Sequence, residues 1–334
     1  MEERDGNTWR IDMRELNHFI AGKHAPGKSG RYGDVFDPST GAVQARVALA
    51  SAADVSAAVA AAAKAFPAWR NVNPQRRARV MFKFKELVEC EIDSLARLLS
   101  SEHGKILADA KGDILRGLEV IEFACGIPHL QKGEFTDSAG PGIDIYSMRQ
   151  PLGVCAGITP FNFPAMIPMW MFGVSIACGN TFVLKPSEKD PSVPLRLAEL
   201  MMEAGAPEGV LNVVNGDKEA VDAILKDPAI KAVSFVGSSA IAEYIYATGS
   251  AHGKRVKAMG GAKNHMIILP DADMGRVVED LLGAGYGSAG ERCMATPVAV
   301  PVGDKTAAAL IERLVPKIES MRIGLPTDEN ANYG

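Results

Sequence analysis

The chain has 334 residues, of which 47% are hydrophobic and 23% are charged, and its formal net charge is −4. This length predicts about two domains, and the composition is ordinary for a globular protein with a large core. The slightly acidic balance excludes a broad basic surface for nucleic acid. The five cysteines form no C-x-x-C pair and the six histidines have no ligand spacing, which indicates neither a disulfide scaffold nor a metal site. We therefore expect a reducing, cytoplasmic location.

The first 140 residues are predicted to be largely helical. Ser51 is a candidate N-cap with an aspartate three residues later, which is a capping-box pattern, and this helix is expected to end at Pro67. A second helical pattern over 74–104 ends at a glycine, and a third follows directly. Alternating apolar and polar residues in "GIDIYSMRQ" then predict an exposed strand or arm over 141–152.

One uncharged stretch, residues 150–184, superficially suggests a membrane span. Four prolines interrupt it, and its unbroken apolar part, 169–178, is far shorter than the roughly 20 residues that a spanning helix needs. The stretch is therefore predicted to be buried core, and no membrane partner is expected.

After residue 153, apolar runs alternate with helical segments. The runs are "GVCAGI", "TFVLK", "VLNVVNG", "AVSFVG" and "HMIIL". Short apolar strands separated by helices predict a doubly wound parallel sheet over 153–263. Ligands bind beyond the carboxyl ends of the strands in such a sheet. A further helix and the strand "ATPVAVPV" are predicted within 264–334.

Two turns at strand ends are candidates for nucleotide binding. Gly237 ends one strand and Ser238 follows at a helix N-cap position, where free N–H groups bind phosphate; an ordinary βα turn uses the same residues. Lys185 and Glu188 follow another strand and can bracket a ribose. Glu188 would repel a 2′-phosphate, which favours NAD over NADP. A capped helix start explains the second pair equally well.

Two further residues are candidates for catalysis. Asn162, between two aromatic residues in "ITPFNFP", either satisfies local backbone groups or donates to an oxyanion. Cys293 ends the small-residue stretch "GAGYGSAGERC", whose glycines allow close approach to the backbone. It is either a buried filler or a nucleophile that a substrate can reach. The other four cysteines lie in apolar patterns, where cysteine acts as a small hydrophobic residue.

The order of "ITPFNFP", "KPSE", "FVGS" and a late cysteine resembles the aldehyde dehydrogenase family. With "GAKNHMIILPDAD" and "GSAGERCMA", the chain is similar to the methylmalonate-semialdehyde dehydrogenase branch over essentially its whole length. The resemblance implies an α/β fold with a doubly wound parallel-sheet NAD-binding domain and an incomplete α/β catalytic domain. The implied parts are a helical part of the cofactor domain (1–140), an arm strand (141–152), a Rossmann-like core (153–263) and a partial catalytic domain (264–334).

The same resemblance implies roles for individual residues. Cys293 is the nucleophile, Asn162 and the Cys293 N–H hold the oxyanion, and Arg116 and Arg292 contact the carboxylate of the substrate. NAD is expected at Thr159, Phe161, Lys185, Glu188, Lys189, Gly237, Ser238 and Gly260. The implied partners are a small semialdehyde and coenzyme A as co-substrate, within a homo-oligomer (a dimer or tetramer).

Met259 departs from the wider family pattern. Most aldehyde dehydrogenases carry a glutamate there, in an E-L-G-G-K motif, whereas this chain reads "MGGAK". Because methionine cannot accept a proton, water is not activated at this position, and a thiol is expected to release the acyl group.

The branch therefore implies an NAD-dependent, decarboxylating conversion of methylmalonate or malonate semialdehyde to propionyl- or acetyl-coenzyme A. The alternatives are a hydrolytic enzyme that releases a free acid and an inactive NAD-binding fragment. The family continues beyond Gly334, so we expect the chain to be the N-terminal two-thirds of such an enzyme.

Overall fold

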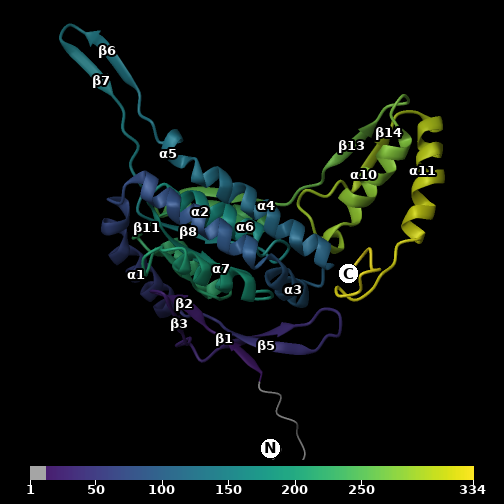
Figure 1. Ribbon diagram of the computed structural model, residues 1–334, viewed down its shortest axis with the longest axis horizontal. Coiled ribbons are helices and arrows are strands. Elements are labelled where there is room, and N and C mark those ends of the chain that lie inside the picture. The colour runs from purple at the N-terminus through teal and green to yellow at the C-terminus, as the bar shows by residue number, and fades with distance from the viewer. Residues whose placement is uncertain (1–12) are drawn as a thin grey trace, which may run out of the picture.

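The computed structural model describes residues 13–334 and contains a central seven-stranded sheet (Figure 1). In spatial order the strands are β12 (Arg255–Met259), β11 (Ile230–Val236), β8 (Val154–Ile158), β9 (Thr181–Lys185), β10 (Leu211–Val213), β2 (His18–Ile20) and β3 (Lys23–Ala25). The first five run parallel, β2 pairs antiparallel with β10, and β3 pairs antiparallel with β2. Every residue of β8 and β9 is buried, as expected for parallel strands covered on both faces. The predicted doubly wound sheet is confirmed for four of its five runs. The fifth run, "HMIIL", pairs with a later strand outside this sheet, and the edge strand β12 was not predicted.

Helices cover both faces of this sheet. One face carries α1 (Ala52–Arg70), α8 (Lys218–Lys226) and α9 (Ser239–Ala251). The other carries α6 (Met166–Ala177) and α7 (Ser192–Glu203), with α2 (Pro74–Cys90), α3 (Ile92–His103), α4 (Leu107–Cys125) and α5 (Ile127–Leu130) further out (Figure 1). Because α6 lies between the sheet and α4, nearly all of it is buried, which explains why it carries no charge. None of the helices in residues 13–334 has the length and apolar character to cross a bilayer.

The contact between α4 and α6 is unusually close, and it supports the site described below. Gly117 of α4 faces Met166 of α6, where a Cβ on the glycine would lie 3.1 Å from the Met166 Cα. Phe172 of α6 packs edge-on against Phe84 of α2, with ring centroids 5.8 Å apart. These helices therefore fix the α6 N-terminus relative to α4.

Residues 14–48 are mostly strands, so the prediction of a largely helical 1–140 is wrong for this part. This part contains β2 and β3 of the central sheet. It also contains a separate three-stranded sheet, with the strands in the order β1 (Arg14–Leu16), β5 (Val43–Ala48) and β4 (Tyr32–Phe36). The strands β1, β2 and β3 have three residues each, which is too short for a period to be seen in the sequence. The prediction for residues 1–12 lies outside the described part of the chain.

The predicted helices are found at 52–130, with two differences. The capping box of Ser51 and Asp54 is confirmed, but α1 continues through Pro67 to Arg70. Ala63, whose carbonyl loses its partner at Pro67, is exposed, so water can satisfy it. The second helical pattern is split at Glu91 into α2 and α3, and it ends as predicted at Gly104, which has a left-handed φ of 93°.

The predicted arm is a β-hairpin that projects from the body (Figure 1). Its strands are β6 (Phe135–Gly140) and β7 (Ile143–Tyr146), so it begins before the predicted 141–152. Apolar side chains on both strands, including Phe135 and Tyr146, are exposed. The hairpin therefore presents an apolar surface that the described chain does not cover.

The last 70 residues form a smaller α/β unit, which contains the predicted helix and strand together with a second long helix that was not predicted. The elements are β13 (His265–Ile268), α10 (Met274–Tyr286), the short 3₁₀ helix η1 (Ser288–Gly290), β14 (Val298–Pro301) and α11 (Asp304–Glu319). The two strands pair in parallel and pack on a small core around Ile268, Leu281 and Leu310. The η1 segment places the residues before Cys293 near the start of α4.

Candidate active site

Five of the predicted cofactor residues line one cavity of about 580 Å³ beyond the carboxyl ends of β8, β9 and β11. They are Thr159, Lys185, Glu188, Gly237 and Ser238. The remaining walls are mainly apolar and include side chains of α8 and α9 that the sequence did not single out, Val221, Ile241 and Tyr244. This is where a doubly wound sheet places its ligands.

The side chains of Lys185, Glu188 and Ser238 in this cavity do not cap a helix. Lys185 is 6% exposed and its Nζ lies 3.0 Å from Glu188 Oε2. The following helix, α7, starts at Ser192 with Pro191 as its N-cap, so a capped helix start does not explain the pair. Ser238 is the N-cap of α9 but makes no side-chain cap bond, which leaves the first N–H groups of that helix free.

Gly260 does not line the cavity but supports its edge. A Cβ at this position would lie 3.1 Å from both the Cα and the Oγ of Ser239. The neighbouring Gly261 N–H donates to Ser239 Oγ at 3.1 Å. The glycine therefore allows the β12–β13 connection to pass close to the start of α9.

Phe161 and Lys189 line a second hollow of about 500 Å³ on the other side of Glu188. The Lys189 Nζ lies 4.4 Å from the centroid of the Phe161 ring, a cation–π contact. His103 and Glu291 line the same hollow, so the residues before Cys293 come near the turn that carries Asn162. Residues 13–334 contain no group of three or more His, Cys, Asp or Glu side chains placed to hold a metal ion.

Asn162 lies in the turn between β8 and α6. Its backbone carbonyl accepts a hydrogen bond from Lys105 Nζ at 2.7 Å. Its side-chain Oδ1 is buried and has no hydrogen-bond partner within residues 13–334. The side-chain oxygen of Asn162 therefore does not accept a hydrogen bond from local backbone groups, which was the first alternative for this residue.

Cys293 is partly exposed and follows a strained turn. Ser288, Ala289 and Gly290 have φ values of 58°, 52° and 72°, and the first two are non-glycine residues in the left-handed region. The Ser288 N–H donates to Asp109 Oδ2 on α4 at 2.7 Å, and Asn264 Nδ2 donates to the Cys293 carbonyl at 3.0 Å. Cys293 is therefore not a fully buried residue.

The two predicted substrate arginines are engaged elsewhere. Arg292 donates to the Gly283 carbonyl at 3.0 Å, and its Nε is buried without a partner in the described chain. Arg116 is 58% exposed and pairs with Glu119 at 2.8 Å along α4. Each guanidinium group is thus paired within its own segment.

Three of the other cysteines have thiols with raised pKa values. Burial raises the pKa of Cys125 to about 11, and it also raises the pKa values of Cys155 and Cys178. These thiols stay protonated near neutral pH and are poor nucleophiles.

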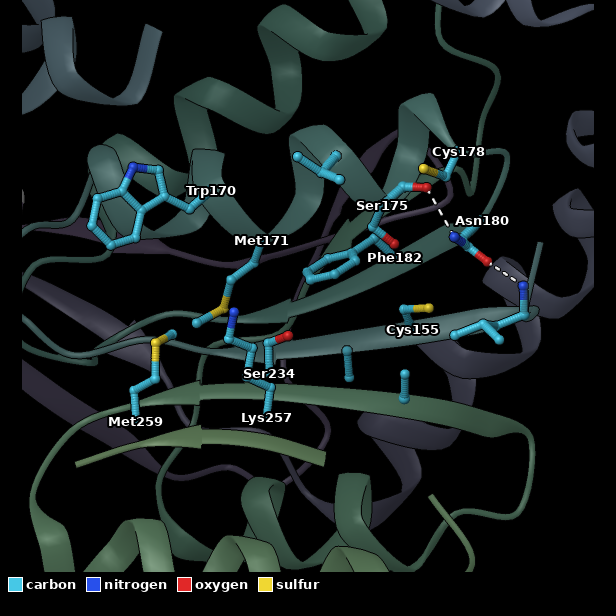
Figure 2. Close-up of a pocket in the computed structure, with 14 residues that line it drawn as sticks. Cys155, Trp170, Met171, Ser175, Cys178, Asn180, Phe182, Ser234, Lys257 and Met259 are labelled. Atoms are coloured by element: carbon cyan, nitrogen blue, oxygen red, sulfur yellow. Dashed lines mark hydrogen bonds between the residues drawn. The ribbon is translucent and has the colours of Figure 1, made fainter. Parts of the chain in front are cut away.

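Met259 lines a third hollow of about 500 Å³, on the α6 face of the sheet. Figure 2 shows Trp170, Met171 and Met259 at one end of it, and Cys155, Cys178 and Asn180 at the other. Asn180 closes that end by bonding the Ser175 carbonyl and the Leu152 N–H. No titratable group stands at the Met259 position itself.

The buried polar residues under the Asn162 turn were missed by sequence reasoning. Lys105 and Asp113 are fully buried, and His103 and Asp190 are nearly so. In the sequence, "EHGKILADAKGD" has the composition of an exposed helix start, and nothing in it indicates burial. Only their contacts with a segment over 50 residues away identify them.

Comparison with known proteins identifies the family to which the chain belongs. The sequence pattern of the aldehyde dehydrogenase family matches residues 24–334, and the chain belongs to that family. It is 55% identical over 322 residues to a malonate-semialdehyde dehydrogenase from Pseudomonas aeruginosa, covering 96% of this chain and 65% of that protein.

Solved structures agree on the fold. A structure from Sinorhizobium meliloti in complex with NAD, assigned as a methylmalonate-semialdehyde dehydrogenase, is 65% identical with a TM-score of 0.95 over 96% of this chain and 66% of its own. A methylmalonate-semialdehyde dehydrogenase from Oceanimonas doudoroffii is 55% identical with the same TM-score, over 96% of this chain and 66% of its own. The chain spans about two-thirds of the length of these relatives.

Proposed function

We propose that the protein carrying this chain is an NAD-dependent, coenzyme A-acylating semialdehyde dehydrogenase. Its substrates would be malonate or methylmalonate semialdehyde, and its products acetyl- or propionyl-coenzyme A and CO₂. The observation that carries the proposal is the cavity that gathers Thr159, Lys185, Glu188, Gly237 and Ser238. The names of the bacterial relatives support the choice of substrate.

The residues that line the cavity of about 580 Å³, called the large cavity from here on, fit NAD. Lys185 and Glu188 would bind the two hydroxyls of a ribose, and the free N–H groups at the start of α9 would face the pyrophosphate. The apolar side chains Val221, Ile241 and Tyr244 would pack against the adenine ring. When bound, NAD supplies an acceptor for the hydride.

Cys293 and Asn162 would carry the carbon chemistry. The Cys293 thiolate attacks the aldehyde carbon, a C–S bond forms, and the carbonyl electron pair moves to oxygen. The Asn162 amide and the Cys293 N–H donate to this oxyanion. Its collapse expels a hydride from the same carbon and leaves a thioester on Cys293.

Release of the acyl group would depend on an external thiol. Because Met259 cannot take a proton from water, the thiol of coenzyme A attacks the thioester and restores the Cys293 thiolate. The β-carboxylate leaves as CO₂, and the α-carbon, which keeps the electron pair, takes a proton from solvent. Arg292 is the guanidinium nearest in sequence to the nucleophile and is proposed to attract the substrate carboxylate. To contact the same substrate carboxylate, Arg116 would have to break its ion pair with Glu119.

Two further parts of the proposal concern assembly and location. The exposed apolar side chains of the β6–β7 hairpin support association into a homo-oligomer. All five cysteines are free, which supports a reducing, cytoplasmic location.

The test is NADH formation from NAD⁺ and malonate semialdehyde, with and without coenzyme A, in the protein that carries this chain. We expect sustained NADH formation only with coenzyme A, its loss in Cys293→Ala, and its retention in Cys90→Ala, which changes an exposed cysteine. Full-rate acid release without coenzyme A would identify the hydrolytic alternative. Unchanged turnover in Cys293→Ala, or no NADH from the unaltered protein, would refute the proposal.

A further inference from the structure

We infer that Lys105 and Asp113 form a buried clamp that positions the Asn162 side chain for oxyanion binding. Neither residue is assigned a contact with substrate or cofactor, so both are positioning residues. The inference rests on the proposed function, because it assumes that Asn162 donates to the reacting oxygen.

The clamp holds the turn between β8 and α6 at both of its ends. Lys105 Nζ donates to the Asn162 carbonyl at 2.7 Å, and Asp113 Oδ1 accepts from the Met166 N–H at 2.7 Å. The two side chains lie 3.5 Å apart, Nζ to Oδ2. One ion pair thus fixes the position of the whole segment 162–166.

Asp113 also replaces a missing helix cap. Helix α6 has Ala165 as its N-cap, and no side chain of α6 itself caps it. A buried helix start with unpaired N–H groups is destabilising. The carboxylate of Asp113, supplied from α4, satisfies the Met166 N–H instead.

The burial of the pair argues against a role in stability alone. Both side chains are fully buried, and Lys105 Nζ also lies 4.3 Å from the centroid of the Phe163 ring. Burial lowers the pKa of Lys105 and raises the pKa of Asp113 to about 6, although each charge partly offsets the shift of the other. Hydrophobic residues in place of a buried ion pair are often equally stable or more so. What they cannot provide is a donor to the Asn162 carbonyl and an acceptor for the Met166 N–H.

The Asn162 side chain depends on its backbone for orientation. Its Oδ1 has no partner within residues 13–334, so no hydrogen bond to that atom aims the amide. The direction of the amide therefore follows the backbone that the clamp holds. A displacement of about 1 Å in a reacting group costs about 100-fold in rate.

The nucleophile segment is attached to the same helix. Asp109, one turn before Asp113 on α4, accepts the Ser288 N–H five residues before Cys293. Both reacting segments are thus placed relative to the start of α4. The clamp sets the distance between them from the Asn162 side.

The experiment is a double-mutant cycle in the protein that carries this chain. The rate of NADH formation in the first turnover with malonate semialdehyde is measured for the unaltered protein, Lys105→Met, Asn162→Ala and the double variant. We expect Lys105→Met to lower this rate about 10- to 100-fold in the unaltered background. In the Asn162→Ala background it should lower the rate less than about twofold, because the side chain that it positions is gone.

Lys254→Met is the matched control. Lys254 is also a buried lysine, 6% exposed, whose Nζ donates to the backbone carbonyls of Asp227 and Ile230, away from the site. We expect this variant to lower Tm without lowering the first-turnover rate. The affinity of Lys105→Met for NAD⁺, measured by fluorescence titration, should be unchanged, since Lys105 does not line the large cavity.

Asp113→Asn provides a second route if Lys105→Met does not fold. Its amide oxygen can still accept the Met166 N–H, while the charge that fixes Lys105 is lost, so a smaller rate loss is expected, again absent in Asn162→Ala. Equal losses of the first-turnover rate in both Asn162 backgrounds, or a lower Tm without a lower rate, would overturn the inference and leave the proposed function standing. If neither variant folds, the pair acts in folding and the inference is wrong. If the unaltered protein forms no NADH, the proposed function fails and the inference fails with it.

Discussion

His103 is expected to make the protein unstable in mild acid. It ends α3, its side chain is 1% exposed, and neither ring nitrogen has a hydrogen-bond partner within residues 13–334. The nearest carboxylate oxygen, Glu291 Oε2, is 3.7 Å from Nε2. Burial, together with the nearby Lys105 charge, lowers the pKa of His103 from 6.5 to about 3.

The sign and the size of the effect follow from these two pKa values. Between pH 6.5 and 3 the unfolded chain binds a proton at His103 that the folded protein does not, so stability falls as the pH falls. A pH of 5 lies 1.5 units below the pKa of 6.5 that His103 has in the unfolded chain. Protonation of the unfolded chain therefore lowers the free energy of unfolding by about 2 kcal/mol. With an unfolding entropy of about 2.1 cal/mol/K per residue over 334 residues, this is about 3 °C in Tm.

The assay is Tm by scanning calorimetry at pH 7.5 and pH 5. Between the two conditions, we expect the Tm of the unaltered protein to fall by about 3 °C more than that of His103→Gln. His252→Gln, which changes an exposed histidine on the C-terminal side of α9, should behave like the unaltered protein. Burial raises the pKa values of Asp113 and Asp190, which acts in the opposite direction, but their effect is common to the three proteins. The same pH dependence in His103→Gln and the unaltered protein would refute the reasoning.

Three other substitutions have definite expected outcomes. Glu188→Ala should tighten NADP binding by about tenfold relative to NAD in fluorescence titrations, because it removes the carboxylate that repels a 2′-phosphate. Met259→Glu should allow sustained NADH formation without coenzyme A, whereas Met259→Gln should not, because only the carboxylate can take a proton from water. Phe172→Ala should lower the free energy of unfolding by about 3–5 kcal/mol in denaturant titrations, because the ring is fully buried against Phe84; a loss below 1 kcal/mol would contradict the packing described.

The sequence predicted correctly those elements whose structure depends on residues close to one another along the chain. The capping box at Ser51, the end of α3 at Gly104 and the buried strands β8 and β9 each depend on residues within one turn or one strand. The continuation of α1 through Pro67 was not predictable, because it depends on solvent reaching the carbonyl of Ala63.

Contacts over long sequence distances could not be predicted. Lys105 and Asn162 are 57 residues apart, and Asp109 and Ser288 are 179 apart, so nothing in either neighbourhood indicates the other. Thr159 of the large cavity was predicted from the family resemblance alone. Lys185, Glu188, Gly237 and Ser238 of the same cavity were predicted because they end or follow strands, and parallel strands end at one edge of the sheet. Arg116 has no such constraint, and the structure leaves it exposed beside Glu119.

The most direct test of the central claim is the covalent state of Cys293 after one turnover. The protein that carries this chain is mixed with NAD⁺ and malonate semialdehyde without coenzyme A, quenched in acid and digested for mass spectrometry. We expect one NADH per chain and an acyl adduct on the Cys293 peptide, which added coenzyme A removes. An unmodified Cys293 with continuing NADH formation would contradict it.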